Sequence, residues 1–205
     1  MISAHEALER LQQGNKRFVS GQSEVLDEKS RRIELIDSQF PFAIVLGCSD
    51  SRVPAELVFD QGLGDLFVIR VAGNIVMPSQ IGSVEFAAEN FGTKLVVVLG
   101  HSQCGAVLGT LEALEEPSES RSPNLGQIVD AIRPSLEALL KHHEGCDREQ
   151  LVKAAVRENV RNSLKRLRHG SEIIENLIEY HQLLVVGAEY SLETGHVDFF
   201  EVPRS

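Results

Sequence analysis

Three short apolar runs constrain the fold of this chain more than any other feature of its sequence. They lie at Ala43–Leu46, Leu66–Ile69 and within Lys94–Leu99. A run that is apolar at successive positions is typical of a strand buried on both faces, as in a parallel sheet. A helical pattern at Ser79–Phe91 provides the crossover that parallel strands need. We therefore expect an α/β fold built on a parallel sheet.

Helical patterns flank this centre on both sides. Ser3 and Glu6 have the spacing of a capping box at the start of a first helix, and a second helical stretch runs from Ser23 to Asp37. After Cys104 the chain is predicted to be mainly helical, before a fourth strand and a hairpin partner. These later elements are Gly105–Leu114, a stretch broken at Pro134, Arg148–Arg168, Ser171–Tyr180, the strand Leu183–Val186 and its partner His196–Phe200.

The sequence contains no internal repeat and no linker long enough to separate two cores. We expect one domain over residues 1–205. Within it, residues 1–40 form a helical arm, residues 41–114 form the core that carries the chemistry, and residues 115–205 supply helices and the closing strands.

Charge and composition exclude several classes of partner. The chain has 20 basic and 30 acidic residues and a formal charge of −10, which argues against nucleic acid or an anionic membrane as the partner. No apolar run approaches the roughly 20 residues of a membrane-spanning helix. The first residues lack the layout of a secretory signal, so we expect a cytoplasmic protein. Its three cysteines are too few for a disulfide framework and favour metal binding or catalysis.

Chemically reactive side chains follow two of the predicted strands. Cys48 comes after Gly47, and His101 comes after Gly100, with Cys104 three residues further on. The carboxyl ends of parallel strands share one edge of the sheet, where ligand sites form. We interpret each glycine as permitting a sharp exit from its strand. Two sulfurs and one imidazole nitrogen form a soft ligand set that favours zinc.

Three protein ligands leave one tetrahedral position open, which is typical of a catalytic zinc site. Water at that position becomes acidic enough to supply hydroxide, although two thiolates should make it harder to ionise than three histidines would. Activity is therefore expected to rise toward alkaline pH. Asp50 and Arg52 can share a face with Cys48 in an extended loop, where the guanidinium would keep the carboxylate ionised and oriented.

The segments Cys48-Ser-Asp-Ser-Arg52 and His101-Ser-Gln-Cys104 together resemble the paired motifs of the β-class carbonic anhydrases. The similarity covers nearly the whole chain and includes residues 62–74. It implies reversible hydration of CO₂ to bicarbonate and a proton by zinc-bound hydroxide. It also implies one Zn²⁺ per subunit beside an Asp50–Arg52 dyad, and a four-stranded parallel sheet with a fifth strand at one edge. Family members are homodimers or dimers of dimers, in which N-terminal helices embrace the neighbouring subunit.

The same resemblance bears on regulation. In some members the dyad aspartate becomes a fourth metal ligand, and a tryptophan helps to form a bicarbonate pocket. This chain has Val45 at the tryptophan position, although Arg70 and Tyr190 match the rest of that pocket. Gln39 and Phe67 match the members with an open site. The pattern favours an open site, and Asp50 remains a candidate metal ligand at low pH.

The resemblance also suggests roles around the substrate. CO₂ would lie against Val71, Phe67 and Phe86, the last standing where many members have tyrosine. Asp50 would accept a hydrogen bond from the attacking oxygen. Gln39 and the backbone near Gly105 would donate hydrogen bonds to a substrate oxygen.

Other functions remain open at this point. The same zinc site could hydrolyse carbonyl sulfide or carbon disulfide, as some relatives do. A scaffold with structural zinc lacks a fourth Cys or His, and a cysteine hydrolase built on Cys48, His101 and Asp50 leaves Cys104 without a role. Gly73 and Asn74 are assigned to tight backbone geometry. A second metal-like cluster, at His142, His143 and Cys146, is interpreted as a solvated helix end.

Overall fold

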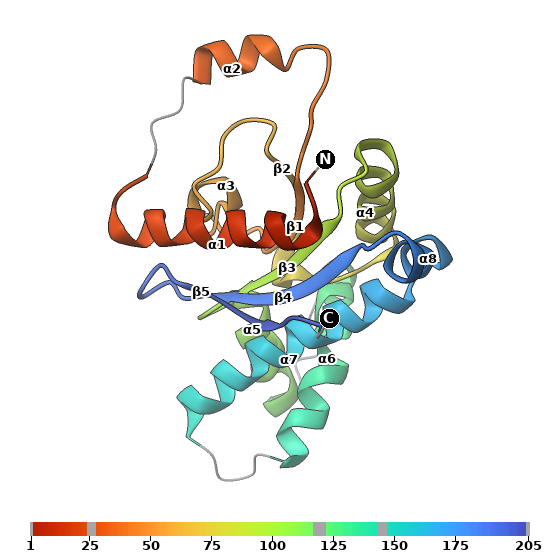
Figure 1. Cartoon of the computed structure of the whole chain (residues 1–205). Coiled ribbons are helices and arrows are strands. Elements are labelled where there is room, and N and C mark those ends of the chain that lie inside the picture. Colours follow the sequence, from red (N-terminus) through yellow and green to blue (C-terminus); the bar gives the residue numbers. More distant parts are fainter. Residues whose placement is uncertain (1, 24–27, 117–121, 143–146, 204–205) are drawn as a thin grey trace.

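A five-stranded sheet forms the centre of the computed structural model, which describes residues 2–23, 28–116, 122–142 and 147–203. The strand order is β2-β1-β3-β4-β5 (Figure 1). The first four strands run parallel and β5 runs antiparallel to β4, which confirms the expected sheet with a fifth edge strand. The strands are β1 Ala43–Gly47, β2 Leu66–Arg70, β3 Leu95–His101, β4 Leu184–Tyr190 and β5 Val197–Glu201.

Helices cover both faces of the sheet. Helices α1 and α3 contribute to the core on one face, α4, α7 and α8 contribute to the core on the other, and α5 and α6 pack beside α7. No helix among the described residues has the length and apolar character to span a membrane. The helices are α1 Ala4–Ser20, α2 Glu28–Glu34, α3 Ala55–Val58, the 3₁₀ turn η1 Ala72–Asn74, α4 Pro78–Phe91, α5 Gly105–Glu115, α6 Pro123–His142, α7 Arg148–His169 and α8 Glu172–Tyr180.

The two-sided burial explains why the strand runs are apolar throughout. In β1, Ala43 and Val45 join the core under α1, whereas Ile44 and Leu46 join the core under α4 and α7. Every residue of β3 is buried as well. Successive strand side chains point to opposite faces, so a strand covered on both faces needs an apolar residue at every position.

Glycines in two neighbouring strands let α7 approach the sheet closely. A Cβ at Gly100 of β3 would lie 2.6 Å from Cγ2 of Val160, and one at Gly187 of β4 would lie 2.7 Å from Cδ1 of Leu164. Both distances are too short for carbon atoms. Glycine at these two positions therefore makes room for side chains of α7 against the sheet.

The interruption predicted at Pro134 is wrong. Helix α6 continues through this residue from Pro123 to His142. Proline removes one backbone hydrogen bond from a helix, but Ile132 and Leu136 on either side are fully buried against α5 and α7. Their packing holds both halves of the helix in line. The side chains of His142, His143 and Cys146 lie outside the described part of the chain, so the expectation for that cluster stays a prediction.

Helix α1 packs on the sheet of its own chain. The capping box of Ser3 and Glu6 is present, and Leu8 and Leu11 are buried in the core beneath the helix. Asn15 anchors its far half: Nδ2 donates to the carbonyls of Val58 (3.0 Å) and Gly195 (2.9 Å), and Oδ1 accepts from the backbone N–H of Val197 (2.9 Å). Helix α2 stands apart from the sheet (Figure 1).

We expect Asn15→Ala to lower the free energy of unfolding by about 2–3 kcal/mol, because it leaves buried backbone groups without partners. Chemical denaturation of the two proteins measures the difference. Asn90→Ala is the matched control, since Nδ2 of Asn90 donates to the carbonyl of Phe86 in its own helix at an exposed site. Equal stability of the two variants would contradict this role of Asn15.

Candidate metal centre

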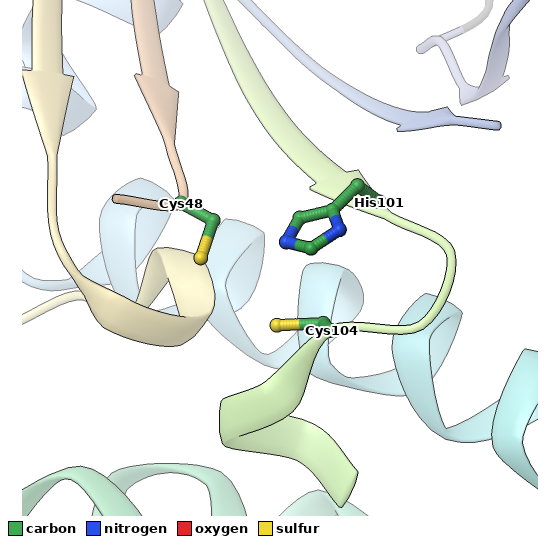
Figure 2. Close-up of side chains that lie close together, drawn as sticks. All are labelled: Cys48, His101 and Cys104. Atoms are coloured by element: carbon green, nitrogen blue, oxygen red, sulfur yellow. The ribbon is translucent and has the colours of Figure 1, made fainter. Parts of the chain in front are cut away.

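Two neighbouring parallel strands deliver the predicted ligands to one point. Cys48 directly follows β1, His101 is the last residue of β3, and Cys104 is the N-cap residue of α5. One ligand atom from each side chain lies within 4.8 Å of the other two. The three side chains converge from different segments (Figure 2). All are buried, with 6%, 0% and 1% of their surface exposed respectively. The structure therefore brings together all three residues of the predicted ligand set.

Neither glycine that precedes a predicted ligand provides the sharp exit from its strand that we expected, because neither has a positive φ. A Cβ at Gly47 would make only ordinary contacts of 3.8 Å or more, so its space does not require glycine. Gly100 is needed instead for the close approach of α7. The sharp turn between the second and third ligands occurs at Gln103, which adopts a left-handed conformation with φ of 55°.

The imidazole of His101 is oriented by its neighbour. Its Nδ1 lies 2.9 Å from the carbonyl oxygen of Ser102. Because a carbonyl only accepts, Nδ1 carries the ring proton and Nε2 of the neutral ring keeps its lone pair. Nε2 is buried and has no hydrogen-bond partner among the described residues. Such an atom fits a metal ligand well, and Ser102 is a functional contact that side-chain motifs could not reveal.

The two thiols of the centre interact strongly. The neighbouring Cys104 thiol, the nearby His101 ring and the Gly73 N–H, which donates to Sγ at 3.4 Å, outweigh burial and lower the pKa of Cys48 well below the ordinary value of a thiol. The resulting thiolate, together with burial, raises the pKa of Cys104. Burial opposes charge on His101, but the nearby Cys48 sulfur and the carbonyl of Ser102 raise its pKa overall.

Asp50 and Arg52 form the expected dyad beside the ligands. Arg52 donates from Nε to Oδ1 (2.9 Å) and from Nη2 to Oδ2 (2.7 Å) of Asp50, and its backbone N–H also donates to Oδ1. These hydrogen bonds hold the pKa of Asp50 well below its usual range. Oδ2 of Asp50 lies 3.9 Å from Nε2 of His101. Asp50 is thus next to the ligand group without belonging to it.

The residues matched to a bicarbonate pocket have other contacts here. Val45 is fully buried in the core. Arg70 donates from Nε to the carbonyl of Cys48 (3.1 Å) and from Nη2 to the carbonyl of Asp50 (2.6 Å), so it holds the loop that carries the dyad. The ring of Tyr190 is buried and lies 6.5 Å from that of Phe18 on α1.

Some of the other candidate residues lie beside the predicted ligands, and the rest lie away from them. Val71 packs against the buried cluster that contains Cys48 and Cys104, and Gly105 begins α5 directly after the last ligand. Phe67, in contrast, pairs in register with Ile44, four residues before Cys48, and so lies about 13 Å from it along the sheet.

Phe86 and Gln39 are also separate from the ligands. Phe86 belongs to an aromatic cluster with Phe67 and Phe91, with centroid distances of 5.7–6.2 Å. Gln39 is exposed in the segment between α2 and β1. Phe67, Phe86 and Gln39 therefore do not join the ligand group through contacts within one chain.

Comparisons with known proteins agree with this geometry. A family model described as carbonic anhydrase matches residues 43–197. The carbonic anhydrase of Mycolicibacterium smegmatis is 39% identical over 196 residues, which are 94% of this chain and 91% of the relative. Carbonic anhydrase 2 of Mycobacterium tuberculosis is 36% identical over 191 residues, 92% of this chain and 89% of the relative.

Solved structures of β-carbonic anhydrases have a fold similar to that of this chain. The β-carbonic anhydrase CcaA matches with a TM-score of 0.75 and 28% identity, over 98% of this chain and 93% of that chain. A tetrameric β-carbonic anhydrase from Sordaria macrospora matches with a TM-score of 0.77 and 24% identity, over 98% of both chains. The second similarity concerns the fold alone.

We expect Arg52→Ala to raise the pKa of the Asp50 carboxyl toward its ordinary value near 4. A ¹³C NMR titration of that carboxyl in the metal-free protein measures the change. Because the folded-state pKa of Asp50 is depressed, the stability that Arg52 adds is present above about pH 4 and is lost as pH falls through the folded-state pKa. Arg133→Ala is the control, since the ion pairs that Arg133 forms with described residues lie within α6. An unchanged Asp50 titration would refute the coupling.

Proposed function

The chain belongs to the β-class carbonic anhydrases, the zinc enzymes that reversibly hydrate CO₂ to bicarbonate and a proton, and on this basis we propose that Cys48, His101 and Cys104 hold its one catalytic Zn²⁺. The main support is the buried, partnerless Nε2 of His101 beside two sulfurs. A buried polar atom without a partner costs free energy, and coordination by a soft divalent cation removes that cost.

Zinc, when bound, supplies a strong oxygen nucleophile near neutral pH and neutralises the two thiolates. Our proposal assigns the remaining tasks to the chain itself. Oδ2 of Asp50 accepts the proton of the nucleophile in a hydrogen bond and so directs its lone pair. Arg52 donates a hydrogen bond to each carboxylate oxygen and keeps Asp50 ionised. This pairing supports an open site, in which the fourth metal position is left to solvent.

We propose that Val71 and the backbone near Gly105 hold the substrate. Val71 packs beside the ligand cluster and provides a surface for CO₂, which has no net dipole. Gly105 is exposed at the start of α5, where backbone N–H groups are available to donate to an oxygen atom. Both residues would thus hold the substrate without any charged side chain.

A second copy of the chain would complete the site. Gln39 is followed by Phe40, which is 73% exposed, and Phe86 is 52% exposed. Large exposed apolar side chains are typical of surfaces that bind a partner. We propose that in a homodimer, alone or within a dimer of dimers, Gln39, Phe67 and Phe86 of one subunit face the metal centre of the other.

CO₂ hydration is favoured over hydrolysis of carbonyl sulfide or carbon disulfide, because the relatives reported above are carbonic anhydrases. A cysteine hydrolase is disfavoured by the position of Cys104, whose sulfur lies within the ligand group. A purely structural zinc site is disfavoured because no fourth ligand joins that group among the described residues.

Two variants test the proposed centre. We expect Cys104→Ser to lose both zinc and CO₂ hydration, because a ligand is missing. Asp50→Asn should keep one zinc per chain but lose most turnover, because the amide cannot accept the proton of the nucleophile in the same way. Metal analysis and stopped-flow CO₂ hydration across pH measure both, with activity expected to rise toward alkaline pH. Full turnover in Asp50→Asn would remove Asp50 from the mechanism, and zinc-loaded wild type without activity would end the proposal.

The shared site is tested by co-expressing Asp50→Asn with Gln39→Ala. Each variant alone should be impaired, and removal of a donor such as Gln39 is expected to cost roughly tenfold or more in turnover. Mixed dimers contain one site with both Asp50 and Gln39 intact, so equal co-expression should restore about a quarter of wild-type activity. A rate no higher than the mean of the two separate variants would contradict the shared site.

A further inference from the structure

A tight turn of the backbone lies against the metal centre. It is η1, residues Ala72–Asn74, which follows β2 and curves beneath Cys48 (Figure 2). The backbone N–H of Gly73 donates to Sγ of Cys48 at 3.4 Å. Gly73 and Asn74 both have positive φ, 70° and 43°, so the turn has the tight geometry expected from the sequence. This conformation is unfavourable for Asn74 and needs support from elsewhere in the fold.

Helix α7 provides that support through two buried side chains. Nδ2 of Asn159 donates to the carbonyl of Gly73 at 2.8 Å, and Oγ of Ser163 donates to the carbonyl of Asn74 at 2.9 Å. The two donors are four residues apart on one face of the helix, and each is only 1% exposed. Two of the three carbonyls of the turn are thereby fixed. The Gly73 N–H lies in the preceding peptide unit, so its direction follows from these bonds through the backbone torsions of Gly73.

The contacts of Asn74 and Asn159 leave buried polar atoms unpaired, which lowers the free energy of unfolding. Oδ1 of Asn159 and Nδ2 of Asn74 are buried without a hydrogen-bond partner among the described residues. Apart from Ser163, the other buried residues of α7 are apolar, including Val156 and Val160. An apolar residue at position 159 would avoid the desolvation of an unpaired amide oxygen. Positions that break the rules of core packing in this way are expected at functional sites.

We propose that Asn159 is a positioning residue of the metal centre. It holds Gly73 so that the N–H of this residue points at the sulfur of Cys48 and orients that sulfur for the metal ion. Ser163 assists by fixing the next residue of the turn. The inference rests on the proposed zinc function of Cys48, His101 and Cys104. Groups that orient metal ligands from behind typically change metal affinity by about 10–100-fold when removed.

The test compares Asn159→Leu with Asn162→Leu. Leucine has the branching of asparagine without its hydrogen bonds. Asn162 is a matched control, because it lies on the same helix and its Nδ2 also donates to a carbonyl, that of Ala131 on α6, at 3.0 Å. Zinc affinity is measured by competition with a chelator. The sulfur-to-metal charge-transfer band is recorded after replacement of zinc by cobalt, and thermal unfolding is recorded for each protein.

Asn159→Leu is expected to weaken zinc binding at least about tenfold and to shift the cobalt band, whereas Asn162→Leu does neither. Wild-type zinc affinity and an unshifted band in Asn159→Leu would overturn the inference. Equal losses in both variants, in proportion to their losses of thermal stability, would also overturn it, because they indicate a structural role only.

A second variant keeps the test decisive if Asn159→Leu does not fold. Ser163→Ala removes only one hydroxyl and should weaken zinc binding in the same direction by a smaller factor. Unchanged zinc affinity in Ser163→Ala would then count against the inference. Wild-type protein that binds no zinc in the same titration would instead refute the proposed function on which the inference rests.

Discussion

The parallel pairing of β1 with β3 determines the position of the candidate metal centre. Gly47, the last paired residue of β1, lies opposite Leu99, so Cys48 directly follows the paired region. His101 lies two residues beyond Leu99 on the neighbouring strand. Parallel direction places both residues at the same edge, and neighbouring strands are about 4.8 Å apart. Any shift in this register would move a ligand away or turn it to the other face. The sheet thus sets the spacing of the first two ligands, and the turn at Gln103 brings in the third.

Much of this arrangement could be predicted from the sequence. Continuous apolar runs revealed the buried strands, and residues placed directly after them revealed Cys48 and His101. The predicted interruption of α6 was wrong because a pattern of residue types does not show that Ile132 and Leu136 would pack on both sides of Pro134. Helix α3, at Ala55–Val58, was missed because one helical turn leaves no periodic signal.

Backbone contacts were the part that the sequence could not show. The carbonyl of Ser102 fixes the tautomer of His101, and the N–H of Gly73 reaches the sulfur of Cys48. Every residue carries such groups, so their use depends on conformation alone and leaves no mark in the residue type. Asn159 could have been noticed as a polar residue on the buried face of a helix, but its target, 86 residues earlier in the chain, becomes visible only in three dimensions.

The close approach of α7 at Gly100 and Gly187 has a consequence for the proposed metal centre. Side chains of α7 lie against two neighbouring strands, and the turn beneath Cys48 is hydrogen-bonded to that same helix. One helix therefore links the interior of the sheet to the residues that we propose as zinc ligands, so that a substitution far from Cys48 along the chain can be transmitted to its sulfur.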